Sequence, residues 1–158
     1  MKREPHHKDE TKMEQLVVFQ LQEQDYAVNI FSVQEIIHVG YITRVPRTPS
    51  YIKGIINLRG KIIPVIDLNK RFHFGREMAS TGEERIIVVE VQGAVMGIMV
   101  DAVTQVLNVP QSQVAFPPAI SEGKVAGLLK AVVPLDDRII MVLDLEKVFS
   151  TLEKDHIA

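Results

Sequence analysis

The feature of this sequence that most constrains its fold is an internal repeat. The stretches "LVVFQLQEQDYAVNI" and "RIIVVEVQGAVMGIMV" each alternate apolar and polar residues on both sides of a short polar turn, which is typical of a β-hairpin. An alignment that places residues 17–36 beside residues 86–105 puts Ser32 on Asp101. Self-similarity at this scale predicts two copies of one small β unit.

The match continues into the second part of each copy. "YIKGIINLRGKIIPVIDLNKRF" aligns with "KVAGLLKAVVPLDDRIIMVLDLEKVF" when the hairpin connection of the second copy is four residues longer. Three residue pairs anchor this alignment: Gly54 with Gly127, Lys61 with Arg138, and Phe72 with Phe149. Each copy then consists of a hairpin, a short helix, an irregular link, a second hairpin and a short helical end. We expect helix at residues 32–37, at residues 101–107, and after Asp67 and Asp144, which are suitable helix caps.

The repeat also predicts the architecture. A β unit of about 60 residues buries only about 60% of its unfolded surface, so the two copies are expected to pack together. Closing each five-stranded sheet into a barrel removes the strand edges that so many Val and Ile residues would otherwise expose. We therefore expect an all-β domain over residues 15–150 made of two five-stranded barrels with short helices. The first repeat covers about residues 16–72 and the second about 86–149, between polar tails at 1–14 and 151–158.

Composition narrows the cellular setting. The chain has 158 residues and no cysteine, and its charged N-terminus lacks the apolar core of a signal peptide. No apolar run reaches the roughly 18 residues that a membrane span requires. The cytoplasm is therefore the expected location.

The sequence also lacks the motifs of common catalytic and ligand sites. "GIINLRGKIIPVIDL" resembles a phosphate-binding loop, but the glycine spacing is wrong and no Ser or Thr follows the lysine. The histidines lack ligand-like spacing to acidic residues, and no nucleophile is accompanied by a recognisable base and acid. We therefore predict a protein that is not an enzyme and has no metal site, cofactor or catalytic residue.

Two positions stand out within the first copy. Arg59 is expected at the exposed tip of a hairpin, because Asn57 and Gly60 tolerate turn geometry and apolar strands flank them. The second copy has no arginine at its corresponding turn, and a difference between otherwise similar copies is where a specific function is expected. Glu35 follows Ser32 at the spacing of a capping box, which favours a purely structural role at a helix start.

Four segments together resemble the CheW family, the coupling adapters of bacterial chemotaxis: "VQEII", "TPSYIKGIINLRGKIIPVIDLNKRF", "MGIMVDAVTQVLNV" and "DDRIIMVLDLEKVF". The resemblance covers about residues 15–150. It implies two interlocked SH3-like barrels and a scaffold that joins the regulatory domain of the histidine kinase CheA to the cytoplasmic helical tips of chemoreceptors. Contact with the membrane would then be indirect, through receptor arrays.

The resemblance also implies a receptor-binding surface. It places receptor contact around the groove between the barrels and near the "NLRG" turn. The matching residues in this sequence are Val33, Glu35, Gly54, Asn57, Arg59 and Gly60. The resemblance leaves the kinase-contacting residues unassigned.

A basic stretch keeps one alternative open. Between Tyr41 and Arg76 there is a single acid, Asp67. Eight basic residues accompany it: Arg44, Arg47, Lys53, Arg59, Lys61, Lys70, Arg71 and Arg76. Such a stretch is typical of a surface that docks on an acidic protein or, alternatively, of a small barrel that binds nucleic acid. The aromatic residues for base stacking would be Tyr51, Phe72 and Phe74, whose positions read mostly as core or loop, so we do not expect a nucleic-acid partner.

Overall fold

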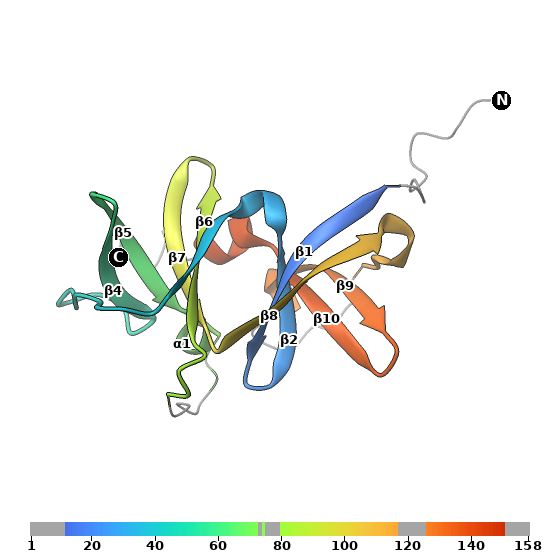
Figure 1. The fold of residues 1–158 in the computed structure, drawn as a ribbon, viewed down its shortest axis with the longest axis horizontal. Helices are drawn as coiled ribbons and strands as arrows, with labels where there is room; N and C mark the ends of the chain where they lie inside the picture. Colours follow the sequence, from blue (N-terminus) through green and yellow to red (C-terminus); the bar gives the residue numbers. More distant parts are fainter. Residues whose placement is uncertain (1–11, 73, 75–79, 117–125, 151–158) are drawn as a thin grey trace.

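The computed structural model describes residues 12–72, 74, 80–116 and 126–150, which form ten strands in two five-stranded sheets (Figure 1). One sheet takes strands from both ends of the chain, and we call it the terminal barrel. Its spatial order is β8 (Ala102–Pro110), β1 (Met13–Leu21), β2 (Gln24–Asn29), β10 (Arg138–Leu143), β9 (Leu129–Leu135). The other we call the central barrel, in the order β3 (Val33–His38), β6 (Arg85–Val91), β7 (Ala94–Val100), β5 (Lys61–Asp67), β4 (Ile52–Leu58).

The two sheets have the same topology because the repeats exchange strands. The first repeat gives β1 and β2 to the terminal barrel and β3, β4 and β5 to the central barrel, and the second repeat does the reverse. Exchanging β1–β5 for β6–β10 converts one strand order into the other. Each barrel therefore contains strands of both copies, as Figure 1 shows where the chain crosses between β2 and β3.

A short bridge joins the two edge strands of each sheet. In the central barrel the chain after β3 returns to β4, where the Thr43 and Ile55 backbones exchange hydrogen bonds of 2.9 and 2.8 Å. In the terminal barrel the chain after β8 returns to β9, and Ala115 and Val132 exchange two bonds of 2.9 Å. These bridges satisfy edge groups that would otherwise be open to strand addition, as expected for barrels.

The core lies in three places, because the strands that begin each repeat are buried on both faces. Val17 and Phe19 of β1 face the seam between the barrels, while Leu16 and Val18 face the interior of the terminal barrel. In β6 the seam-facing residues include Ile87, and Ile86 faces the interior of the central barrel. Burial on both faces explains why these strands read as continuous apolar runs rather than as strict alternation.

The hairpins are confirmed, but the register between the copies differs by one residue from the predicted alignment. The turns Gln22–Glu23 and Gln92–Gly93 correspond, which pairs Val17 with Ile87 rather than with Ile86. Both Val17 and Ile87 face the seam. A shift of one residue moves every side chain to the other face of a strand, and runs of consecutive Ile and Val hide such a shift in the sequence.

Both predicted internal helices are wrong. Residues 32–37 lie mostly in β3, and residues 101–107 lie almost entirely in β8. Ser32 does not cap a helix, because it ends the 3-10 turn η1 (Ile30–Ser32), which Asn29 caps. The Val, Ile and Thr residues in these segments prefer strand, and this preference together with pairing to β6 and β1 outweighs the capping pattern.

The helical ends after both aspartates are confirmed. Asp67 accepts backbone hydrogen bonds from Asn69 and Lys70 at the start of α1 (Leu68–Arg71), and Asp144 accepts one from Lys147 at the start of the helical residues 145–150. Two more 3-10 turns, η2 (Gln111–Gln113) and η3 (Ala126–Leu128), lie in the links.

The longer connection expected in the second copy is wrong. Both second hairpins have two-residue turns, Arg59–Gly60 and Asp136–Asp137. The residue of the second repeat that is equivalent to Gly54 is therefore Ala131, not Gly127. Gly54 has φ +153°, and a Cβ there would lie 2.2 Å from the Thr43 carbonyl oxygen and 2.7 Å from a methyl carbon of Ile42. The bridge to Thr43 therefore requires glycine at position 54, whereas the terminal barrel has alanine at the equivalent position, Ala131.

We predict that Gly54→Ala lowers the free energy of unfolding by about 2–4 kcal/mol, because the new Cβ collides with backbone and cannot relax cheaply. Gly60→Ala is the matched control. Gly60 also has positive φ, +84°, but no atom lies within 4 Å of its Cβ position, so only about 1–2 kcal/mol of backbone strain is expected. Urea denaturation measures both values, and equal losses would contradict the assigned packing at Gly54.

Candidate functional site

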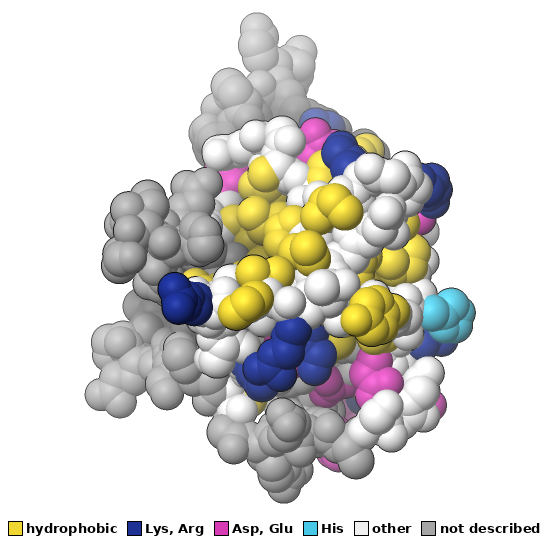
Figure 2. Space-filling view, turned by 90° about the vertical axis from the view of Figure 1, so that its left-hand side faces the viewer, with side chains coloured by type: hydrophobic (Ala, Val, Ile, Leu, Met, Phe, Trp, Pro, Cys, Tyr) yellow, Lys and Arg dark blue, Asp and Glu magenta, His cyan; other side chains and the backbone are white. Residues whose placement is uncertain are grey.

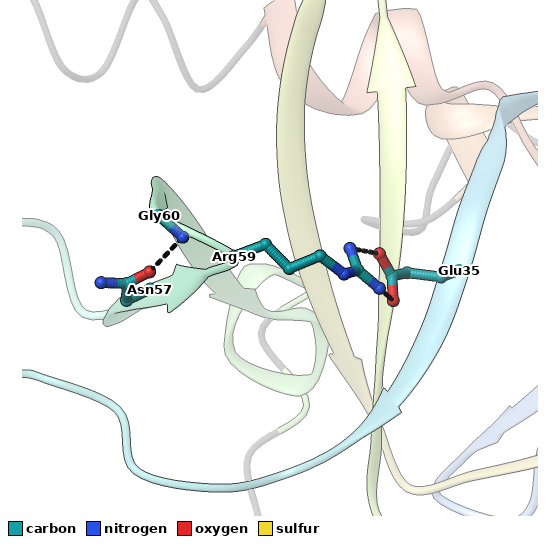
Figure 3. A network of polar contacts seen from close by, with 4 residues as sticks. All are labelled: Glu35, Asn57, Arg59 and Gly60. Atoms are coloured by element: carbon teal, nitrogen blue, oxygen red, sulfur yellow. Dashed lines mark hydrogen bonds and ion pairs between the residues drawn. The ribbon is translucent and has the colours of Figure 1, made fainter.

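The predicted turn at Arg59 is confirmed and is fixed by its own side chains. It joins β4 to β5, with Arg59 at φ +52° and Gly60 at φ +84°. Asn57 reaches across the turn, and its Oδ1 accepts the Gly60 backbone N–H at 2.8 Å (Figure 3). The left-handed geometry at two consecutive residues is the one that two-residue hairpins favour. The start of the Arg59 side chain is thereby held in one direction.

Arg59 is paired with Glu35, although sequence analysis assigned them unrelated roles. Nη1 donates to Oε2 at 2.5 Å and Nη2 donates to Oε1 at 2.6 Å, so the pair is bidentate (Figure 3). Glu35 lies on β3 and Arg59 follows β4, the two edge strands of the central sheet. The ion pair therefore spans the two edges of this barrel and gives the guanidinium a defined plane.

The pair is accessible to solvent and to a partner. The Arg59 side chain is 71% exposed and that of Glu35 is 25% exposed. The hydrogen bonds from Arg59, followed by its charge, hold the pKa of Glu35 below its ordinary value, and the same contact raises the pKa of Arg59. Both groups therefore remain charged at neutral pH and form a fixed surface dipole rather than a stabilising core interaction.

The other residues of the predicted receptor surface have different surroundings. Val33 begins β3 and packs partly against the core at the seam. Gly54 is buried within β4, and Asn57 and Gly60 build the turn. The structure thus brings Asn57, Arg59, Gly60 and Glu35 together at one end of the central barrel, while Gly54 supports the same barrel from inside.

Sequence analysis missed the pairing because it placed Glu35 on a helix. The sequence "VQEIIH" shows no period-two pattern, because polar Glu35 lies on the half-buried face of β3 with Val33 while apolar Ile36 is exposed. Sequence analysis also missed exposed apolar residues on the central barrel and its adjoining loop: Ile36, Val39, Tyr41 and Ile62. On the side where β4 and β5 lie in Figure 1, hydrophobic side chains gather beside Lys and Arg (Figure 2).

The basic stretch does not form a continuous nucleic-acid surface. Arg71 is buried and lies over the Tyr51 ring at 5.9 Å from its centroid, and Arg59 is paired with Glu35. Tyr51 and Phe72, two of the three aromatic residues considered for base stacking, are buried in the core. Arg76 lies outside the described residues. These contacts remove the stacking platform that single-strand binding needs.

The part of the chain that the structure describes contains neither a metal-binding cluster nor a membrane-spanning helix. There, no three or more His, Asp or Glu side chains are grouped so that they could hold a metal ion. Among the same residues, no helix has the length and apolar character needed to cross a membrane. The described residues form two packed five-stranded barrels, with the Arg59–Glu35 ion pair at one end of the central barrel.

Comparison with known proteins identifies the class as a scaffold and gives the family. The CheW-like domain matches residues 15–153. A crystal structure of the scaffolding protein TtCheW from Thermoanaerobacter tengcongensis superposes with a TM-score of 0.80 at 39% identity, covering 87% of this chain and 93% of that one. This chain belongs to the CheW family of chemotaxis proteins and is a non-enzymatic scaffold.

Curated relatives agree with this assignment. The chemotaxis protein CheW of Treponema pallidum is 37% identical over 147 residues, which are 91% of this chain and 86% of the relative. CheW of Klebsiella aerogenes is 34% identical over 145 residues, 91% of this chain and 86% of that protein. The all-β, two-barrel fold that the resemblance implied is confirmed.

We predict that Arg59→Ala raises the pKa of Glu35 toward its ordinary value, because the hydrogen bonds that favour the carboxylate are lost. Lys61→Ala is the control, since it removes a neighbouring positive charge but leaves the bidentate pair. An NMR titration of the side-chain carboxyl carbon measures the pKa in each variant. Titration of Glu35 at the same pH in wild type and Arg59→Ala would contradict the ion pair.

Proposed function

We propose that this protein couples the histidine kinase CheA, through its regulatory domain, to the cytoplasmic tips of chemoreceptors. It would act in the cytoplasm at membrane-bound receptor arrays. The observation that carries the proposal is the exposed, bidentate Arg59–Glu35 pair at the tip of a rigid barrel. The similarity to a protein described as scaffolding supports it.

The receptor-facing surface in this proposal is the end of the central barrel around the ion pair. Its residues are Val33, Glu35, Gly54, Asn57, Arg59 and Gly60, with Gly54 acting only through the backbone geometry that it permits. Glu35 engages Nη1 and Nη2 of Arg59 and leaves further N–H donors of the guanidinium for a partner. Because the pair is already ordered, binding loses less side-chain entropy than it would with a free arginine.

The equivalent hairpin tip of the second repeat carries a different residue, which supports a specific role for Arg59. Asp136 occupies the turn position that Arg59 has in the first repeat, also with positive φ. The two barrels therefore share a scaffold but present opposite charges at equivalent tips. An adapter needs two different surfaces on one rigid body, and weak contacts of this kind become stable when many partners are linked in an array.

We predict that Arg59→Glu weakens binding to a receptor-tip fragment by about 1–3 kcal/mol, the scale of an interface anchor. It should leave the melting temperature nearly unchanged, because both side chains of the pair lie at the surface. Isothermal titration calorimetry measures the affinity, and Lys61→Glu serves as a control for the change in net charge.

The double variant Glu35→Arg, Arg59→Glu tests whether the partner needs the guanidinium at the hairpin tip or only an ordered ion pair there. It can restore an ion pair with reversed orientation, so affinity should stay low if the partner needs the guanidinium at the tip. Wild-type affinity in Arg59→Glu alone would contradict the proposed receptor surface.

A further inference from the structure

Arg71 is a buried cation at the junction of the two repeats. It is the last residue of α1, and only 8% of its surface is exposed. Its Nη2 donates to the carbonyl oxygen of Val148, in the second repeat, at 3.4 Å, and its guanidinium lies 5.9 Å from the centroid of the Tyr51 ring. The buried Nε has no hydrogen-bond partner, and among the described residues no carboxylate forms an ion pair with Arg71. The surroundings therefore compensate this buried charge only in part.

The second repeat has an apolar residue at the same place. Asp67 and Asp144 cap the two equivalent short helices by accepting a backbone N–H three residues later. Arg71 follows Asp67 by four residues and Val148 follows Asp144 by four, so the two are equivalent. Val148 is buried in the core at the seam. Because a buried charge with poor partners costs free energy that valine avoids, stability alone does not explain Arg71.

Arg71 and Val148 are not only equivalent but in contact with each other. Equivalent residues of two repeats meet only where the axis that relates the repeats passes close to both. The Val148 carbonyl belongs to the last turn of the helical residues 145–150, whose carbonyl groups have no partner within the helix and can accept from elsewhere. Positions 71 and 148 therefore share one buried site on this axis, and the site holds a single guanidinium.

The exchange of strands gives this shared site a consequence for assembly. Each barrel needs strands from two repeats, and identical elements can also be exchanged between chains. Two first repeats that paired with each other would bring two guanidinium groups into the site, and two second repeats would bring two valines. Like charges at short distance repel strongly where water is excluded. Pairing of like repeats therefore costs more free energy than pairing of a first with a second repeat.

We propose that Arg71 makes the two repeats select each other, because the site shared by positions 71 and 148 admits one guanidinium. A first repeat then pairs with a second repeat and not with another first repeat. Pairing of unlike repeats gives one molecule both hairpin tips, Arg59 and Asp136, whereas pairing of like repeats would give two equal ends. This inference concerns how the scaffold assembles, and it holds whether or not the proposed receptor surface is correct.

Moving the charge between the repeats tests the shared site. Val148→Arg adds a second guanidinium and should lower the melting temperature by about 10 °C or more, the scale of an uncompensated buried charge. The double variant Arg71→Val, Val148→Arg keeps one guanidinium, on the other repeat, and should recover most of this loss. Val148→Met controls for side-chain size and should lose clearly less. Circular dichroism melting measures each variant, and a double variant as unstable as Val148→Arg would contradict the shared site.

Mixing of chains tests the selection itself. Arg71→Val and Val148→Arg are unfolded together in urea, refolded at equal concentrations and examined by native mass spectrometry, which distinguishes the two chains by mass. Every site in Val148→Arg alone holds two guanidinium groups, whereas a dimer that exchanges repeats between the variants has one at each site. We expect this mixed dimer several-fold above its statistical share. Wild type mixed with isotope-labelled wild type is the control, and its dimers should form in statistical proportion.

The mixing experiment separates selection from a purely structural role of Arg71. A structural role alone predicts that Arg71→Val changes the melting temperature and that the variant mixture stays at its statistical share. A statistical share, or the absence of mixed dimers, would therefore overturn the proposal. If Val148→Arg does not fold alone, the mixture still decides, because only exchange of repeats with Arg71→Val relieves the crowded site and returns that chain to a folded dimer.

Discussion

The apolar seam between the two barrels is the contact on which the rest of the structure depends. Phe19 and Tyr26 of the terminal barrel stack there with ring centroids 6.1 Å apart. Tyr26 also contacts Phe72, which follows β5 of the central barrel and α1. Burial at this seam raises the pKa of Tyr26 to about 12. Because each barrel takes strands from both repeats, neither repeat completes a sheet alone. The seam and the strand exchange thus make one rigid body from two small units.

This duplication explains how a small protein presents different surfaces. The scaffold residues correspond between the copies, as Asp67 and Asp144 do at the helix starts. The turns between strands diverge, as Arg59 and Asp136 do at the hairpin tips. Turn residues contribute little to the core, so they can change without loss of the fold. In CheW-family proteins, such divergence can supply one scaffold with distinct contacts at each end.

Much of the fold follows from the sequence, and the errors have physical causes. Period-two alternation was sufficient to predict the hairpins at Gln22 and Gln92. The helix caps Asp67 and Asp144 were sufficient to predict the short helices that follow them. The capping pattern at Ser32 was misleading, because strand pairing with β6 decides the conformation of Glu35. The Arg59–Glu35 pair joins segments far apart in the chain. Its geometry depends on how the sheet curves to bring β3 and β4 together, which local patterns do not encode.

We propose that one copy of this protein binds the kinase domain and the receptor tip at the same time through separate surfaces. The most direct measurement is analytical ultracentrifugation of the full chain mixed with the CheA regulatory domain and a receptor-tip fragment. We expect a ternary complex that sediments faster than either binary complex. Mutual displacement of the kinase domain and the receptor fragment would contradict it.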